Sequence, residues 1–293
     1  MMDSRLWVTM VTVLMLLPIG CTSAPTQTSN TPTTTAESPE LNPQAQQTIR
    51  IVGAATPYPA MKLLASAYEK QASDTKIDFL ESSQTAGGIA GVKEKLVDIG
   101  TVTREPKAEE VADELTYRKL AQDALLVATN PSVEGVSNLT TEDLRAIYSG
   151  QATNWQEFGG PDAAIVVLDR PEDESAKWLL RKYYLGPDLT ISPDAIVLRD
   201  ESDLAEATQT TPYAIGAFSL SKAISNNLPV NRIILDGVAP TPENLREGNY
   251  SMARTLGIVW YGTPSETTQE FIDFIFSEAG ADVLLKAGFA PIK

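Results

Sequence analysis

The feature that most constrains the fold of this chain is the regular alternation of short apolar runs with stretches of helical periodicity. A strand is expected at residues 49–54, and a helix follows it. The apolar residues that recur there at helical spacing are Ala60, Met61, Leu64, Ala65 and Tyr68. A strand at 76–81, a glycine-opened helix that ends at Val97 and a strand at 98–103 repeat the pattern. Such alternation packs helices against a mixed or parallel sheet, so we expect an α/β protein.

The same alternation continues through the rest of the chain. Thr140 and Asp143 resemble the two ends of a capping box, which starts a helix that stops at Gly150. The other expected elements are strands at 123–130, 164–169 and 213–219 and helices at 174–185 and 267–285. With 293 residues and no visible internal repeat, the chain has room for one large domain or two of ordinary size.

The first residues have the layout of a signal peptide. Arg5 precedes an apolar run at 6–17, and Gly20 lies directly before Cys21. The run would cover about 18 Å as a helix, less than the roughly 30 Å of a hydrocarbon core. A small residue before a cysteine resembles the bacterial lipobox, in which the cysteine becomes the acylated N-terminus. We therefore expect a signal peptide at 1–20 and a lipid anchor at Cys21, with a soluble secreted form as the alternative.

The segment that follows is expected to be a linker. Residues 21–47 consist mostly of Thr, Ser, Pro, Gln and Asn, with almost nothing to bury, so they should form a disordered spacer. A folded body on such a tether would lie on the periplasmic or cell-surface face of a membrane.

Composition excludes several classes of function. The chain has no histidine, which removes His general bases, Ser-His-Asp and Cys-His sites and His-ligated metals. The net charge of −15 makes nucleic acid and anionic membrane poor partners. A small anion is still compatible with this charge, because backbone N–H groups and a single arginine can bind it. We expect no metal and no cofactor.

Four groups of short motifs occur in order between residues 50 and 293. The first is Gly53-Ala54-Ala55-Thr56 with Pro59, and the second is Thr85-Ala86-Gly87-Gly88-Ile89 with Asp98-Ile99-Gly100. The third is Val136-Ser137-Asn138-Leu139-Thr140, Ile147-Tyr148-Ser149-Gly150, Asn154-Trp155 and Gly159-Gly160-Pro161-Asp162. The fourth is Thr211-Pro212-Tyr213-Ala214-Ile215-Gly216, Phe271-Ile272-Asp273-Phe274 and Lys286-Ala287-Gly288-Phe289.

Together these motifs resemble the phosphate-type periplasmic substrate-binding proteins of ABC transporters. The resemblance implies a periplasmic-binding-protein-like fold with a ligand cleft between two α/β lobes, which close over an anion. We expect lobe one at 48–128 and 229–293, and lobe two at 129–228.

The first candidate ligands lie in lobe one. Thr56, at a helix start, could offer its hydroxyl to an anion or serve only as a helix cap. Thr85 and Gly87 would let the backbone approach a ligand, or form only a turn. Thr103 lies where the resemblance places a polar or acidic contact.

The other candidates lie around the acidic run 172–174. Arg170 ends an apolar strand, and its guanidinium can bind an oxyanion through two parallel hydrogen bonds, or form a surface ion pair. The family has Ser-Gly-Thr four residues after this arginine, whereas here Ser175 follows five residues later. Lys177, two residues beyond Ser175, is either a replacement donor or a solvated lysine. Arg254 is a further cationic candidate. Trp178 lies one helical turn beyond Ser175 and should sense a bound ligand.

Three functional hypotheses follow. The first is a monomeric solute-binding lipoprotein that captures an inorganic anion, most simply phosphate, and delivers it to an ABC transporter permease without any enzymatic step. The second keeps the fold but makes the protein a sensor or scaffold lipoprotein with a degraded phosphate site. The third is an oxyanion hydrolase with a metal at Asp169, Glu172 and Asp173; clustered acids in a loop are usually solvated, so we rank it last.

Overall fold

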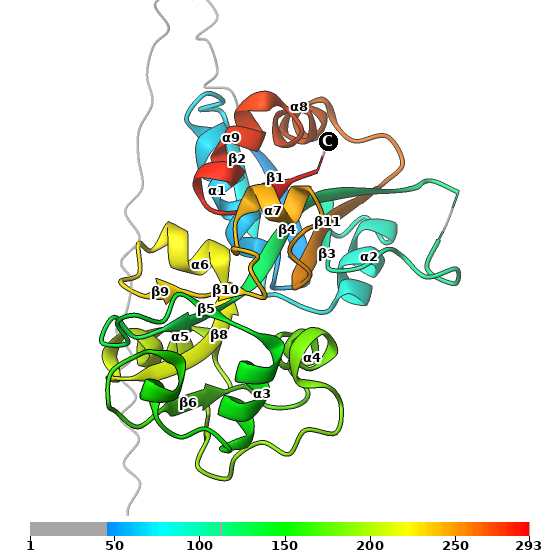
Figure 1. The fold of residues 1–293 in the computed structure, drawn as a ribbon. Helices are drawn as coiled ribbons and strands as arrows, with labels where there is room; N and C mark the ends of the chain where they lie inside the picture. Colours follow the sequence, from blue (N-terminus) through cyan, green and yellow to red (C-terminus); the bar gives the residue numbers. More distant parts are fainter. Residues whose placement is uncertain (1–45, 112, 293) are drawn as a thin grey trace, which may run out of the picture. The chain divides into compact units, whose positions relative to one another are not determined.

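One main sheet extends through both halves of the folded chain (Figure 1). The computed structural model describes residues 46–111 and 113–292, which fall within one compact unit. The strands on the path of this sheet are β1 (Gln47–Gly53), β2 (Thr75–Phe79), β3 (Ile99–Val102), β4 (Leu115–Thr129), β6 (Val166–Asp169), β7 (Ile196–Val197), β8 (Ala214–Ser219) and β11 (Ala253–Tyr261). Their order is β2-β1-β3-β11-β4-β8-β6-β7.

The first part of the sheet carries the first core. Strands β2, β1 and β3 are parallel, as expected for successive β/α units. The helices around them are α1 (Tyr58–Glu69), α2 (Thr85–Lys93), α8 (Glu266–Ile275) and α9 (Glu278–Lys286). The first core includes Ile49, Ile51, Met61, Leu64, Ile99, Leu120, Ala121, Phe271 and Leu284. Val52 packs instead with the cluster under α2, because successive side chains of a strand point to opposite faces.

The second part of the sheet carries the second core. Strand β8 is antiparallel to β4 and parallel to β6, which is parallel to β7. The helices here are α3 (Thr141–Ser149), α4 (Ser175–Leu180), a π-helix (Arg181–Leu185), α5 (Glu201–Thr210) and α6 (Leu220–Ser225). The second core includes Ala124, Leu126, Tyr148, Trp155, Leu168, Leu204, Phe218 and Met252.

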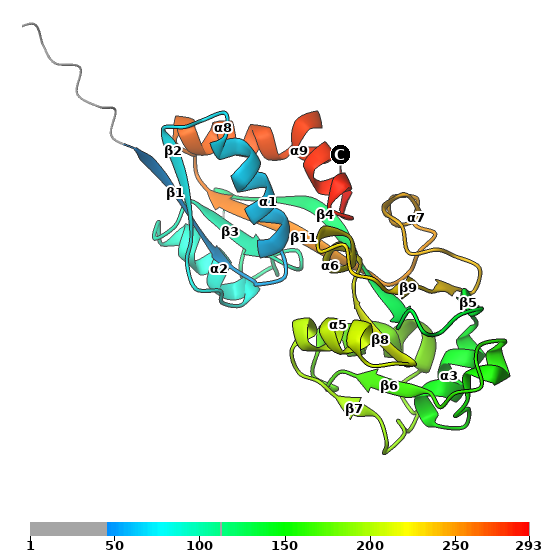
Figure 2. The ribbon, with the colours of Figure 1, turned by 90° about the vertical axis from the view of Figure 1, so that its left-hand side faces the viewer.

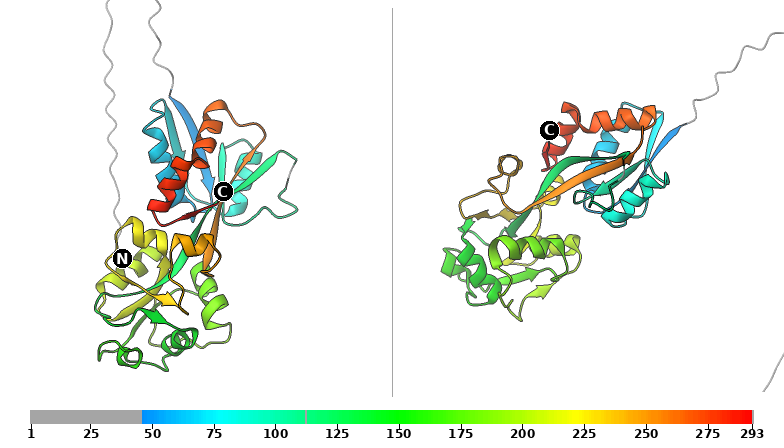
Figure 3. Two further views of the ribbon diagram at one scale, coloured as in Figure 1. Left: turned by 45° about the horizontal axis from the view of Figure 1, so that its top comes forward. Right: turned by 90° about the vertical axis from the view of Figure 1, so that its right-hand side faces the viewer.

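Two long strands connect the cores. The 15-residue strand β4 contributes Ala121 to the first core and Ala124 to the second, and β11 is its antiparallel neighbour. Figures 2 and 3 show these two strands side by side between the two groups of elements. The shorter elements are β5 (Asn138–Leu139), a 3-10 helix (Trp155–Phe158), β9 (Asn231–Arg232), β10 (Ile234–Leu235), α7 (Pro242–Arg246) and β12 (Ala290–Pro291).

Some helix boundaries predicted from the sequence are confirmed, and others differ in the structure. The capping box at Thr140 and Asp143 is confirmed, as is the helix end at Gly150, which has φ 76°. The helix expected at 174–185 is instead α4 followed by the π-helix. The helix expected at 267–285 is two helices, because the Ser277 hydroxyl accepts the N–H of Gly280 and caps a new start.

Part of the expected organisation concerns residues that the structure does not describe. The signal peptide, the lipidated Cys21 and nearly all of the linker lie outside the described residues. Within residues 46–111 and 113–292, no helix combines the length and apolar character needed to cross a bilayer. The limits expected for the two lobes stay a prediction.

Candidate functional site

A cavity of about 320 Å³ brings hydroxyl side chains and one arginine together. Its lining comes from loops of the first core, from α4 of the second core and from β11. The lining residues are Thr56, Thr103, Ser175, Trp178, Leu179, Ala253, Arg254 and Thr255. Five residues singled out in the sequence therefore share one cavity: Thr56, Thr103, Ser175, Trp178 and Arg254. No carboxylate is among these lining residues.

The parallel pairing of β1 and β3 explains why two threonines from separate loops meet. Thr56 follows β1 and Thr103 follows β3, so both lie at the carboxyl edge of the sheet, where α/β proteins usually bind ligands. Gly53 allows the end of β1 to lie close to β3. It has φ 140°, and a Cβ at this position would overlap the carbonyl oxygen of Thr101.

Thr85 lies behind Thr103. The Thr85 Oγ1 accepts the backbone N–H of Thr103 at 3.1 Å and lies 3.2 Å from the Thr103 Oγ1. Thr85 is buried and is not part of the cavity lining, so its hydroxyl positions Thr103. Gly87 lies two residues further along α2, where a Cβ would overlap the hydroxyl of Ser83.

Arg170 is a buried cation with unused hydrogen-bonding capacity. It is 8% exposed, and its Nη2 lies 3.1 Å from Oε2 of Glu174. Its Nε and Nη1 are buried and have no acceptor among the described residues. Buried donors without an acceptor are rare in native proteins. Arg170 is close in sequence to Ser175 but does not line the cavity.

Lys177 is directed away from the cavity. Its side chain is fully buried, its Nζ lies 2.5 Å from Oδ2 of Asp169, and the carboxylate of Glu172 is 3.7 Å away. The same ammonium lies 5.8 Å from the centre of the Tyr148 ring. Lys177 therefore neutralises the buried Asp169, and the cation of the cavity lining is Arg254.

Arg254 is held by two carboxylates. Its Nη2 lies 3.2 Å from Oδ2 of Asp123, and its Nη1 lies 3.4 Å from Oε2 of Glu201. Burial by itself lowers the pKa of Arg254, but the two carboxylates outweigh burial and raise that pKa above its usual value. Burial raises the pKa of Asp123 despite the attraction of Arg254. Burial by itself raises the pKa of Glu201, but the attraction of Arg254 and the hydrogen bonds from Ser219 together outweigh burial and lower that pKa. The Nε of Arg254 is buried without a partner among the described residues.

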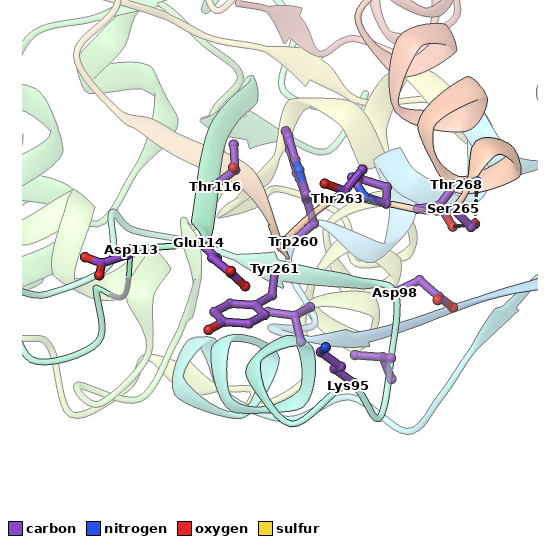
Figure 4. Close-up of a pocket in the computed structure, with 14 residues that line it drawn as sticks. Lys95, Asp98, Asp113, Glu114, Thr116, Trp260, Tyr261, Thr263, Ser265 and Thr268 are labelled. Carbon is purple, nitrogen blue, oxygen red and sulfur yellow. Dashed lines mark hydrogen bonds between the residues drawn. The ribbon is translucent and has the colours of Figure 1, made fainter.

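Two other cavities are lined by carboxylates. A cavity of about 440 Å³ shares Thr56 and Arg254 with the first, and its lining includes the acidic residues Asp123, Asp200 and Glu201. A cavity of about 560 Å³ lies at the end of β11. Its lining includes the acidic residues Asp98, Asp113 and Glu114, with Lys95 as the basic residue (Figure 4). A carboxylate about 4 Å from a bound anion costs roughly 1 kcal/mol in water and about 4 kcal/mol at an effective dielectric of 20. Of these three cavities, the 320 Å³ cavity therefore suits an anion best.

Three lining residues are not among those predicted from sequence: Leu179, Ala253 and Thr255. In the sequence, Leu179 has the pattern of an ordinary apolar residue in an amphipathic helix, so it gives no signal of a binding site. The available signal for Thr255 is its position next to Arg254, an isolated cation. Trp178, expected to sense a ligand, does line the cavity. In the described part of the chain, no cluster of three or more metal-ligating side chains occurs.

Comparison with known sequences places these features in context. A family model described as the PBP superfamily domain matches residues 29–279. The phosphate-binding protein PstS of Borreliella burgdorferi is 27% identical over 261 residues, which cover 86% of this chain and 92% of that protein. The phosphate-binding protein PstS of Bacillus subtilis is 25% identical, with 85% of this chain and 82% of that protein covered.

Solved structures agree with the sequence comparison. A phosphate ABC transporter substrate-binding protein of Clostridium perfringens, crystallised with bound phosphate, has a TM-score of 0.67 and 27% identity over 84% of this chain and all of that chain. An ABC-type phosphate transport receptor of Vibrio cholerae has a TM-score of 0.61 and 27% identity over 83% of this chain and 99% of that chain. The likeness confirms the expected fold class, α/β with two periplasmic-binding-protein-like lobes.

Proposed function

Because this chain belongs to the PBP superfamily, we propose that it is the solute-binding protein of an ABC transporter and that its ligand is an inorganic oxyanion, with phosphate the first to test. Membership confirms the family resemblance expected from the sequence. The relatives and solved structures named as phosphate-binding support phosphate for this chain.

The observation that carries this proposal is the chemistry of the 320 Å³ cavity. Its hydroxyl groups, from Thr56, Thr103, Ser175 and Thr255, can each donate a hydrogen bond by rotation. Arg254 adds a guanidinium donor, although Asp123 and Glu201 balance its charge, and no carboxylate is among the lining residues. A lining of hydroxyl and guanidinium donors suits a small anion.

Arg170 supports the proposal independently. Two of its nitrogens lack acceptors among the described residues, although the side chain is buried. Hydrogen bonds between charged groups contribute about 1.5–3 kcal/mol each, so a guanidinium that reached the anion would supply a substantial part of the roughly −8 kcal/mol of micromolar binding. Arg170 does not line the cavity, so this contact would require its side chain to move away from Glu174.

The membrane context is part of the proposal. We place the folded body outside the cytoplasmic membrane, tethered through Cys21, where it acts as a monomer that passes its ligand to a permease. Binding and release need no covalent step, so no catalytic residue is assigned. The relatives named as ABC transporter binding proteins support the partner.

A second candidate function is a sensor or scaffold lipoprotein of the same fold. Two pairings favour it: Glu174 lies against Arg170, and Asp169 pairs with the buried Lys177. Both pairings reduce the positive charge available to an anion near α4.

Isothermal titration of the purified mature chain with phosphate, sulfate and methylphosphonate separates the two functions. The transport proposal expects saturable binding of phosphate at micromolar concentrations, with a rise in melting temperature, because a ligand of the native state stabilises it. No heat and no melting shift with any of the three anions at millimolar concentrations would favour the sensor or scaffold.

A further inference from the structure

A further cavity of about 370 Å³ shares no residue with the 320 Å³ cavity. It lies where β4, the corner between α8 and α9 and the end of the chain after β12 come together. Its apolar lining includes Leu120, Ile275, Leu285 and Ile292. The volume falls within the roughly 300–1,000 Å³ typical of sites for organic ligands. The cavity is therefore large enough for a small organic molecule.

The short strand β12 leaves part of the first core accessible at this cavity. It pairs with β4 at Ala121 and Gln122, and the N–H of Ile292 donates to the carbonyl of Leu120. Before Leu120, β11 is the neighbour of β4 among the described strands. Leu120 is buried in the first core, whereas Leu285 and Ile292 are only partly buried. Apolar side chains thus line a space that a ligand can enter.

Two arginines bring positive charge to this apolar cavity. The Cζ of Arg118 lies 3.5 Å from the centre of the Phe276 ring, a contact that restricts the guanidinium while its N–H groups stay available to an anion. Arg246, at the end of α7, is the second cation. Neither arginine forms an ion pair with a carboxylate that the structure describes. The two arginines outnumber Glu278, the one carboxylate among the described lining residues.

From this lining we propose a second binding site, for an organic anion that combines one acidic group with an apolar body, such as an arylalkyl carboxylate. The acidic group binds the guanidinium groups of Arg118 and Arg246, whose planar N–H forks match a carboxylate. The apolar body packs on Leu120, Leu285 and Ile292 and is removed from water. The inference goes beyond the proposed function, because this cavity shares no residue with the one assigned to the oxyanion.

The mixed lining favours this class of ligand over simpler ones. An inorganic anion could contact the guanidinium groups, but it would leave the apolar lining in contact with water. A neutral apolar molecule would cover the guanidinium groups without offering them an acceptor. An organic cation would be repelled by the two arginines. Only a molecule with both an acidic and an apolar part satisfies the whole lining.

The test is titration calorimetry of the purified mature chain with phenylpropionate, and with its uncharged amide as the matched ligand control. Arg118→Gln removes one cation of the site, and Ala281→Phe adds a ring at a lining position of α9 and fills the cavity. Lys119→Gln is the control variant. It removes one positive charge from the next residue of β4, whose side chain is 47% exposed and does not line the cavity. Melting temperatures without ligand show that each variant is folded.

We expect phenylpropionate to bind the wild type at millimolar concentrations or below, and Arg118→Gln to weaken that binding about tenfold, as loss of a hydrogen bond between charged groups allows. Ala281→Phe should abolish the binding, whereas Lys119→Gln should leave it within about twofold. Phosphate affinity should be the same in all four proteins, and saturating phosphate should not displace phenylpropionate.

Absence of phenylpropionate binding to the wild type would overturn the inference. Equal affinity for the amide, or equal affinity in Arg118→Gln, would overturn it too, because the guanidinium groups would then play no part. Displacement by phosphate would place the molecule in the 320 Å³ cavity instead. Binding of phenylpropionate by a protein that ignores phosphate would support this site and refute only the proposed function.

Discussion

Arg254 of β11 lies directly opposite Asp123 of β4, and the Arg254 Nη2 is 3.2 Å from the Asp123 Oδ2. Their side chains are only 12% and 4% exposed. This cross-strand pair lies where β4 and β11 pass from the first core to the second. Glu201, at the start of α5, also contacts Arg254, so one guanidinium connects both crossing strands to a helix of the second core.

Arg254→Ala should strongly destabilise the fold. Removing one partner of a buried ion pair leaves uncompensated buried charge, here Asp123 and Glu201, and typically costs about 3–5 kcal/mol. Urea unfolding measures this loss. Arg199→Ala is the matched control, because its side chain is 67% exposed and should change the free energy of unfolding by less than about 0.5 kcal/mol. Similar midpoints for both variants would show that the Arg254 pair is energetically neutral.

Glu110 should make stability depend on acidity. The Arg104 guanidinium, hydrogen-bonded to its carboxylate, together with the N–H of Lys107 lowers the pKa of Glu110 from 4.5 to about 2. A lowered carboxyl pKa stabilises the native state fully above about pH 4.5, and this stabilisation is lost as the pH falls toward about 2. Glu110→Gln should therefore show a smaller drop in urea midpoint between about pH 5 and pH 3 than the wild type.

The control for this pH effect is Glu109→Gln, whose side chain is 72% exposed. It should follow the wild-type curve. A Glu110→Gln curve that also superimposes on the wild type would contradict the role assigned to the Arg104 pair.

Arg170→Ala should weaken phosphate binding by about 1.5–3 kcal/mol, the range for hydrogen bonds to charged groups. The expected defect is in binding, because Arg170 contacts only Glu174 among the described charged groups. Arg170→Lys should recover part of the affinity, since an ammonium cannot reproduce the planar fork. Titration calorimetry gives the three affinities, and equal values would place the anion away from Arg170.

Thr103 should make the site tolerant of both phosphate and sulfate. Dibasic phosphate carries a proton and can donate a hydrogen bond, whereas sulfate carries none. A carboxylate in the site would accept the hydrogen bond of phosphate and repel sulfate. The Thr103 hydroxyl can donate or accept by rotation, so both anions should bind. Thr103→Asp should reduce sulfate affinity much more than phosphate affinity in parallel titrations. Strong rejection of sulfate by the wild type would identify another discriminating group, such as the run at 172–174.

Cys21→Ser should move the protein from the membrane fraction to the soluble fraction. The reason is that Gly20-Cys21 ends an apolar leader, and only a thiol can be acylated there. Fractionation followed by mass determination of the N-terminus measures the outcome. A variant that stays in the membrane fraction with its leader intact would exclude the lipid anchor.

The fold could be predicted from local patterns where one face of an element is buried. The strand expected at 49–54 and the capping box at Thr140 follow from residues close in sequence, and both occur. The strand expected at 123–130 is β4, which begins already at Leu115. Residues 115–122 include Arg118 and Lys119, and their extended conformation depends on pairing with β11, a contact that no local pattern reveals.

The site could be predicted only in part, because residue type does not fix the direction of a side chain. Thr56, Thr103 and Ser175, which the family resemblance singled out, share the cavity. Lys177 follows Ser175 by only two residues, yet it lies on the other face of α4 and pairs with Asp169. Arg254 lines the cavity because β11 lies between β3 and β4, which only the completed sheet determines.

The position of β11 also governs the order in which the newly made chain can assemble. Its sheet neighbour β3 ends at Val102, whereas β11 ends at Tyr261, so about 160 residues must be synthesised before β3 can gain this partner. At about 5–20 residues per second, that interval lasts about 8–32 s. During this time the early strands β1, β2 and β3 present an unpaired edge that is open to mispairing. In the exported protein that we propose, this delay would postpone the pairing of β3 with β11 until synthesis is nearly complete and keep the chain threadable during export.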